Sequence, residues 1–277
     1  MKKLVLFLII LAFASSVVNA EKRPEPQPAP EKKEMFDIAM AGYTFVKFDI
    51  DKAIETMKRT DVHNLCIKDF HLPLNSSQDE IDAFLKKLED NGIKGYAVGP
   101  IYMKSEAEID QAFEYAKKVG VKLIVAVPEY ALLPYVDKKV KEYGFNIAIH
   151  LHGPDINKYP DAKDVWDHVK DLDPRIGMCL DIGHDTRYGN DVVKDIKKYH
   201  TRIFDVHLKD VTGNTGKGYS VEVGRGIIDI PGVVNALRKV KYNGMLSLEH
   251  ERNMDNPFLG IAESIGYIRG VIAATQK

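Results

Sequence analysis

Hydrophobic and polar side chains alternate along several short segments of the chain, with the two-residue period of a β-strand. Within residues 176–181, Met178 and Leu180 occupy one face of the predicted strand, whereas Cys179 and Asp181 occupy the other. The acidic residue therefore ends a face of small side chains at the carboxyl end of the strand. Three more segments end in the same way, and their polar or small faces are Asn146, Ala148, His150 and His152; Asp205, His207 and Lys209; and Ser247 and Glu249.

Strand-like segments alternate with segments that have the periodicity of amphipathic helices. The predicted strands are 36–41, 62–68, 94–99, 122–127, 146–151, 176–181, 203–209 and 245–249. The predicted helices are 50–60, 78–91, 107–119, 132–143, 162–171, 191–200, 232–240 and 258–274. Strands that alternate with helices in this way predict an α/β protein with a single (β/α)8 TIM barrel.

An open, doubly wound sheet is the alternative to the barrel. It would place a glycine-rich phosphate-binding turn directly after the first strand. The sequence Gly42-Tyr43-Thr44-Phe45 at that position is not such a turn. Gly224-Arg225-Gly226 lies in the long loop after the seventh predicted strand and does not open a helix, so it does not indicate dinucleotide binding.

The first 34 residues have a different composition from the rest. Lys2 and Lys3 precede the apolar run Leu4–Phe13, and small residues end at Ala20, which predicts a signal peptide over 1–20 and a secreted or periplasmic protein. The run is shorter than the roughly 20 residues of a spanning helix, so we expect no stable membrane insertion after cleavage. Alternating prolines predict a disordered linker over 21–34, and the barrel domain would occupy 35–277.

Length and charge narrow the class of protein further. The chain has 277 residues, 45% of them hydrophobic, and a net charge of −1. This length suits one barrel domain, and the near-neutral charge argues against a nucleic-acid partner. Cys66 and Cys179 both lie in predicted strands among apolar residues, so we interpret them as small core residues and not as a disulfide.

In a TIM barrel the carboxyl ends of all strands open at one mouth, so residues far apart in sequence meet there. The predicted mouth residues with acid, base or metal-binding side chains are Lys68, His71, Glu129, His150, His152, Asp181, His184, His207, Lys209 and Glu249. Two imidazoles and two carboxylates from consecutive strands could hold one divalent metal, Mn, Zn, Co or Fe, and we expect His150, Asp181, His207 and Glu249 to be its ligands. The alternative for each is a hydrogen-bonded side chain that lines the barrel.

These segments carry a resemblance to a known family. Ile-Ala-Ile-His150, Leu-Asp181-Ile-Gly-His184, Val-His207-Leu-Lys-Asp210, Gly224-Arg-Gly-Ile-Ile-Asp229 and Leu-Ser-Leu-Glu249 together resemble the xylose isomerase-like barrels, which include sugar isomerases, epimerases and inosose dehydratases. The resemblance implies metal ligands at the ends of strands five to eight, at the four positions named above. It also implies that His184 and Arg225 contact substrate.

The sequence departs from this family at the fifth strand. His150 stands where the resemblance implies the first of two glutamates that exchange a proton on opposite faces of the substrate. The departure disfavours a symmetric epimerase and favours elimination. A ligand set with one charge fewer also leaves more Lewis acidity on the ion.

Further roles are assigned around this set. Candidate acid–base groups are Glu249, His152, Glu129 and Lys68, although the Glu129 carboxylate could instead cap the following helix; candidate substrate-binding groups are His71, His184, Lys209 and Arg225. The sequence thus predicts a secreted, metal-dependent enzyme that abstracts a proton next to a carbonyl of a non-phosphorylated sugar or keto-sugar. The outcome would be isomerisation, epimerisation, or β-elimination as in a lyase or dehydratase acting on 3-keto-glycosides.

Two other functions compete with this one. A sugar-binding protein on an inactive barrel would keep the fold without the chemistry. An abasic-site endonuclease on the same barrel would need a basic rim, which the near-neutral charge opposes. Oligomerisation is compatible with the sequence.

Overall fold

The computed structural model describes residues 36–276, so the predicted signal peptide and linker lie outside the described residues. Eight parallel strands close into a barrel in the order β1-β10-β7-β6-β5-β4-β3-β2, which confirms the predicted (β/α)8 fold. The barrel strands are β1 (Asp37–Ala41), β2 (Asn64–Ile67), β3 (Lys94–Met103), β4 (Leu123–Pro128), β5 (Asn146–His150), β6 (Ile176–Asp181), β7 (Ile203–Leu208) and β10 (Met245–Leu248).

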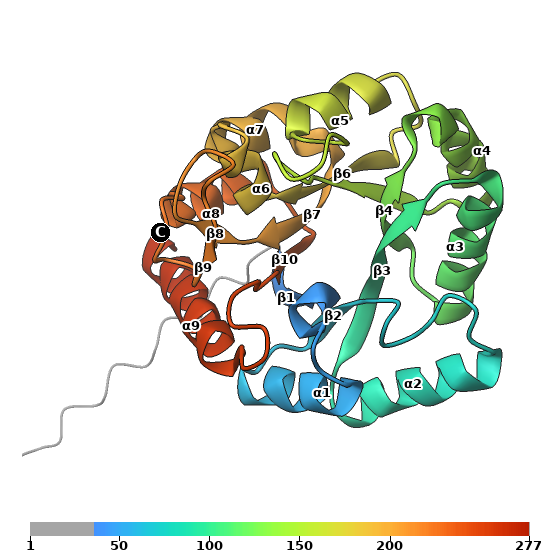
Figure 1. The fold of residues 1–277 in the computed structure, drawn as a ribbon, viewed down its shortest axis with the longest axis horizontal. Coiled ribbons are helices and arrows are strands. Elements are labelled where there is room, and N and C mark those ends of the chain that lie inside the picture. The colour runs from blue at the N-terminus through green and yellow to red at the C-terminus, as the bar shows by residue number, and fades with distance from the viewer. Residues whose placement is uncertain (1–35, 277) are drawn as a thin grey trace, which may run out of the picture. The chain divides into compact units, whose positions relative to one another are not determined.

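Helices follow the strands and form a ring outside the barrel (Figure 1). They are α1 (Ile50–Arg59), α2 (Gln78–Asp90), α3 (Glu106–Val119), α4 (Leu133–Tyr143), α5 (Ala162–Val169), α6 (Ile182–Arg187), α7 (Val192–Tyr199), α8 (Ile230–Lys239) and α9 (Phe258–Thr275). Side chains at their N-caps fix several starts. Ser77 and Glu80 form a capping box at α2, and Asp49 and Asp161 cap α1 and α5.

The structure differs from the predicted elements in two places near the mouth. β3 continues to Met103, four residues past the predicted end. The short helix α6 begins immediately after β6, because the Oδ1 atom of Asp181 accepts a hydrogen bond from the backbone N–H of His184 at 2.8 Å. Asp181 therefore ends a strand and caps a helix at once.

The barrel interior is filled by small side chains at the level of its strands. Cys66, Ala97, Val125, Ala148 and Cys179 are fully buried there and contact one another. Both cysteines are free thiols. The larger apolar side chains pack between the strands and the outer helices, which is the usual location of the main core in this architecture.

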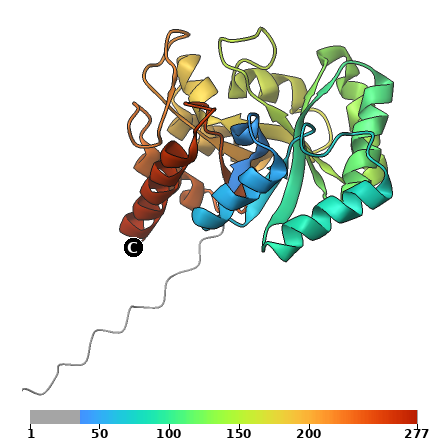
Figure 2. The same ribbon diagram turned by 60° about the horizontal axis from the view of Figure 1, so that its bottom comes forward.

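The last helix, α9 (red), lies beside the first, α1 (blue), and so completes the ring of outer helices (Figure 1 and Figure 2). By length and composition alone α9 is apolar enough to span a membrane. Its Ile261, Ile265 and Ile268 side chains are buried against the barrel, as expected for an outer helix of this fold.

One carboxylate organises the long loop between β7 and α8, which contains the antiparallel pair β8 (Asp210–Val211) and β9 (Ser220–Val221). The Asp210 side chain accepts backbone hydrogen bonds from Val211, Gly224 and Gly226 at 2.9 Å each, and from Ile228 at 3.2 Å. A Cβ at Gly226 would lie 2.1 Å from Asp210 Oδ1, so only glycine allows this approach. Backbone N–H groups from separate parts of the loop thus all bind one side chain, that of Asp210.

Candidate metal centre and substrate pocket

Four buried side chains meet at the carboxyl ends of neighbouring strands. They are His150 from β5, Asp181 from β6, His207 from β7 and Glu249 just after β10. One nitrogen or oxygen atom from each lies within 4.8 Å of the others. Strand alternation places these four side chains on the inner face, and the barrel brings the strand ends together.

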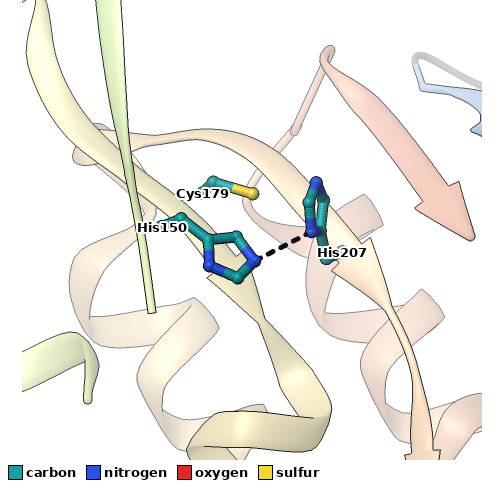
Figure 3. Close-up of side chains that lie close together, drawn as sticks. All are labelled: His150, Cys179 and His207. Atoms are coloured by element: carbon teal, nitrogen blue, oxygen red, sulfur yellow. Dashed lines mark hydrogen bonds between the residues drawn. The ribbon is translucent and has the colours of Figure 1, made fainter. Parts of the chain in front are cut away.

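The two imidazoles point toward one another, as Figure 3 shows. His150 Nε2 lies 3.1 Å from His207 Nδ1. Glu249 Oε2 lies 3.2 Å from His207 Nδ1 and 3.6 Å from His150 Nε2, and Asp181 Oδ2 lies 3.8 Å from His150 Nε2. Four donor atoms thus face a common centre.

This donor set fits a divalent transition metal. Asp181 Oδ2 and Glu249 Oε2 are buried, and the two carboxylates share a single ammonium, that of Lys209, at 3.1 and 3.0 Å. One positive charge leaves part of their negative charge uncompensated. A buried carboxylate oxygen is costly unless a cation compensates it. Two imidazole nitrogens with two carboxylate oxygens are ligands that Zn, Mn, Co and Fe accept.

Cys179 also lies beside the two histidines and could form a second, smaller set with them (Figure 3). Burial raises the pKa of its thiol well above the usual value, so the sulfur keeps its proton. Metals bind the thiolate and not the thiol. The set with two carboxylates is therefore the better candidate.

The Asp205 carboxylate lies near the second ring nitrogen of His207. His207 Nε2 lies 4.0 Å from Asp205 Oδ2, and the Tyr96 hydroxyl donates to that same oxygen at 2.7 Å. Burial raises the pKa of Asp205 to about 6. For His207, burial acts in the opposite direction, but the Glu249 and Asp205 carboxylates prevail and raise its pKa to about 9. No hydrogen bond joins the two groups, so Asp205 acts on the His207 ring through its charge.

Lys209 lies inside the cluster. Its Nζ atom is 3.1 Å from Asp181 Oδ2, 3.0 Å from Glu249 Oε2 and 2.8 Å from Glu251 Oε2. It also lies 3.4 Å from His184 Nε2. Burial would lower the pKa of Lys209, but the three carboxylates raise it well above its usual range, so the side chain is an ammonium.

A pocket of about 280 Å³ opens above the cluster. Its lining residues are Tyr43, Lys68, Pro100, Tyr102, His150, His152, Asp155, His184, Glu249 and Glu251. His150 and Glu249 therefore belong both to the cluster and to the pocket wall. A ligand in this pocket would contact the candidate metal centre directly.

Two pocket histidines are uncharged at neutral pH. Burial and the neighbouring His150 lower the pKa of His152 to about 3. Burial and the Lys209 ammonium lower the pKa of His184 to about 4. The Tyr102 hydroxyl lies 3.0 Å from His152 Nε2, while the buried Nδ1 of His152 has no hydrogen-bond partner. His152 thus presents a neutral imidazole beside the candidate centre.

Three predicted site residues belong neither to this pocket nor to the cluster around Lys209. His71 places its Nε2 atom 2.8 Å from the Phe48 carbonyl oxygen and lines a separate pocket. Glu129 forms an ion pair with Lys158 and makes no capping hydrogen bond. The exposed Arg225 side chain, a predicted substrate contact, pairs with Glu263 on α9, with Nη2 2.8 Å from Oε2. Glu129 directly follows β4, whereas His71 and Arg225 follow a strand by several residues, where the loop path and not strand alternation decides direction.

Four pocket residues with polar side chains escaped the sequence analysis: Tyr43, Tyr102, Asp155 and Glu251. Glu251 could have been found, because it follows Glu249 at the two-residue spacing. Tyr102 lies in the part of β3 beyond the predicted strand. Asp155 lies in a loop and Tyr43 in a single turn of 3-10 helix, Gly42–Phe45, where neither period applies. Lys68 does line the pocket, and its ammonium contacts Asp69 and the Pro100 carbonyl oxygen.

Comparisons with known proteins agree with this architecture. The family model described as "Xylose isomerase-like TIM barrel" matches residues 37–271. The inosose dehydratase of Geobacillus thermodenitrificans is 29% identical over 147 residues, which are 46% of this chain and 48% of that protein. The chain spans no more than half the length of the curated relatives it matches.

Solved structures share the fold at low identity. The IolI protein, crystallised with a zinc atom, has a TM-score of 0.73 at 18% identity, over 87% of this chain and 100% of that one. An L-ribulose 3-epimerase has a TM-score of 0.67 at 13% identity, over 87% of this chain and 95% of that one.

Proposed function

This chain belongs to the xylose isomerase-like TIM barrel family, and we propose that it is a metal-dependent enzyme acting on a non-phosphorylated sugar or keto-sugar. The proposed reaction removes a proton from the carbon next to a substrate carbonyl. The observation that carries the proposal is that His150 and Glu249 belong both to the four-residue cluster and to the pocket wall.

The proposed ligands are His150, Asp181, His207 and Glu249. When bound there, a divalent ion supplies Lewis acidity that polarises a carbonyl oxygen in the pocket. The pocket side chains then orient the substrate and move the proton. Glu249 and the neutral His152 both border the pocket, so each is a candidate to accept the proton from carbon.

The unequal residues at the ends of β5 and β10 favour elimination over inversion. An epimerase needs two acid–base groups, one on each face of the carbon that it inverts. An imidazole whose lone pair is donated to an ion cannot accept a proton, so His150 is excluded from that role if it is a ligand. Elimination needs one base, with the electrons of the broken C–H bond forming a double bond as the β C–O bond breaks. The departing oxygen then takes up a proton.

The charges around the pocket support a substrate without phosphate. Lys68 and Lys209 are both paired with carboxylates. Asp155 is paired with Arg187, but Glu249 and Glu251 share the single Lys209 ammonium with Asp181, so negative charge remains at the wall. A phosphate group would meet repulsion from these acids and would have to displace an existing ion pair. We also propose that the protein acts outside the cytoplasm, as the first 20 residues predict.

The test uses a 3-keto-glycoside and an inosose-like ketone in deuterated water, with products followed by NMR and mass spectrometry. We expect cleavage or dehydration to be faster than inversion of any centre. Glu249→Gln should abolish turnover together with deuterium exchange at the carbon next to the ketone. Clean inversion without a released aglycone or water would refute elimination and favour an epimerase.

One observation favours a second function, a sugar-binding protein without catalysis. The Lys209 ammonium contacts both Asp181 and Glu249, so these buried carboxylates have a cationic partner without a metal ion. Elemental analysis of the purified protein, combined with sugar binding measured by calorimetry, separates the two functions. Binding of sugar by a protein that takes up no metal would favour the second.

A further inference from the structure

The position of Lys209 has a consequence for metal binding that goes beyond the proposed reaction, although it rests on the metal centre proposed above. Its ammonium lies 3.1 Å from Asp181 Oδ2 and 3.0 Å from Glu249 Oε2. These two oxygens also face His150 within the cluster, at 3.8 and 3.6 Å from its Nε2 atom. The ammonium and a divalent ion would therefore require the same two oxygens.

Both cations cannot occupy that position together. An ammonium and a divalent ion held by the same buried oxygens would repel one another strongly, because water does not screen them there. The Lys209 side chain is only 2% exposed, and the carboxylates of Asp181 and Glu249 are nearly as buried. An arriving ion must therefore displace the ammonium.

The structure shows where the displaced ammonium can go. Glu251 Oε2 is already 2.8 Å from Lys209 Nζ, and Glu251 is partly exposed on the pocket wall. The stem of Lys209 lies against Gly183, where a Cβ would come within 2.7 to 2.9 Å of three stem carbons. The stem is thus confined on that side, while the ammonium end has a carboxylate partner toward the pocket.

We propose that Lys209 is an internal competitor of the metal: its ammonium neutralises Asp181 and Glu249 in the metal-free protein and moves onto Glu251 when the ion binds. The exchange keeps the buried carboxylates compensated in both states. It also limits metal affinity, because the ion must displace the ammonium from two carboxylates.

The test measures Zn²⁺ and Mn²⁺ affinity of the metal-stripped protein by competition with a chromophoric chelator, without any substrate. We expect Lys209→Met to bind each ion at least roughly tenfold more tightly than the unmodified chain, because a competing charge a few ångströms away is removed. Lys139→Met is the matched control. Lys139 is also a buried lysine paired with two carboxylates, Asp110 at 3.0 Å and Glu142 at 2.9 Å, but it lies on α4 outside the pocket. Lys139→Met should therefore leave metal affinity unchanged.

A double-mutant cycle tests the role of Glu251. Glu251→Gln alone should weaken metal binding, because the displaced ammonium loses its partner. The same substitution in the Lys209→Met background should have little effect. If the weakening is equally large in that background, Glu251 acts on the ion directly and the proposed exchange is wrong.

Other outcomes are equally decisive. Unchanged or weaker binding by Lys209→Met, while the unmodified chain binds one ion, would overturn the competition and leave the metal centre intact. Failure of both proteins to bind metal would refute the centre itself. Should Lys209→Met not fold, a crystal structure of the zinc-loaded unmodified chain decides. The proposal requires Lys209 Nζ to have left Asp181 and Glu249 while it still contacts Glu251, and an ammonium that remains on all three would contradict it.

Discussion

His150 Nε2 and His207 Nδ1 face each other at 3.1 Å across the inside of the barrel mouth. Two ring nitrogens at this distance are held by one proton between them or by a shared cation. Two carboxylate oxygens, from Asp181 and Glu249, border the same space and share only the Lys209 ammonium. We therefore expect a divalent cation to bind there.

Asp181→Ala should strip the bound ion, because it removes a ligand oxygen and leaves three donors. Metal content per chain, measured by plasma mass spectrometry, should fall from about one to near zero. His168→Ala is the control. His168 lies on α5, where its ring stacks on Tyr130, and its loss should leave the metal content unchanged. Stoichiometric metal in the Asp181 variant would show that the ligand set is wrong.

Cys179→Ser should retain the ion. The thiol lies beside His150 and His207 but keeps its proton, so it contributes packing and no ligand. The visible spectrum of the cobalt-substituted protein is the measurement, because thiolate ligation adds an intense charge-transfer band near the ultraviolet. We expect the spectra of the unmodified and variant proteins to coincide. Loss of such a band on substitution would make the sulfur a ligand.

Asp205→Asn should weaken metal binding by about tenfold, because it removes a buried negative charge close to a ligating histidine. Asp205 Oδ2 faces His207 Nε2 at 4.0 Å and is held by Tyr96. Tyr96→Phe should have a smaller effect in the same direction, because it removes only the hydrogen bond that holds the carboxylate. Chelator competition measures both, and equal effects would contradict this order.

Asp210→Ala should lower the free energy of unfolding by about 2–4 kcal/mol, because four backbone N–H groups lose their acceptor and one loop loses its organiser. Asp229→Ala is the matched control. That carboxylate caps α8 through Gly232 alone, so its loss should cost about 1 kcal/mol. Urea unfolding followed by circular dichroism gives both values. Equal losses would mean that the loop does not depend on Asp210.

The pH dependence of the free energy of unfolding should reveal the interaction between two carboxyl groups, those of Asp185 and Asp195. Burial, aided by Asp195, raises the pKa of Asp185 from the ordinary 3.8 to about 8. Between these two values the unfolded chain has lost the Asp185 proton while the folded chain keeps it. This group therefore makes its full contribution to stability below pH 4 and loses it as the pH rises through 8.

Asp195→Asn is the variant that tests this pair. An amide facing Asp185 could donate a hydrogen bond to its ionised carboxylate, so the variant should lose less stability between pH 5 and pH 8 than the unmodified chain. Urea unfolding at both pH values measures the difference. An unchanged slope would show that the two carboxyls do not interact.

The sequence predicted best where strand alternation alone decides which way a side chain points. His150, Asp181, His207 and Glu249 end barrel strands, and the structure gathers all four. Alternation also placed Lys209 on the inner face. It could not show that the ammonium reaches back to Asp181 and Glu249, since that depends on side-chain torsions and on the space left by Gly183.

The sequence could not show where a side chain lies when the path of its loop depends on distant contacts. Arg225 lies in the loop that Asp210 holds, and a partner on α9 draws it away from the pocket. His71 follows a turn that leads it to the Phe48 carbonyl. Tyr102 reaches the pocket because β3 is longer than its apolar pattern indicated. Neither the two-residue period of a strand nor the repeat of a helix predicts any of these contacts.

Asp181 uses one oxygen to cap α6 and turns the other toward the cluster. Its side-chain torsion is therefore set by the helix before any ion arrives, and little rotational entropy remains to be lost on ligation. The positive end of the α6 dipole withdraws electron density from the same carboxylate. Asp181 is therefore a weaker electron donor to a metal than an uncapped aspartate. A ligand that is pre-oriented yet electron-poor suits an ion that must be captured readily and still attract electrons from its substrate.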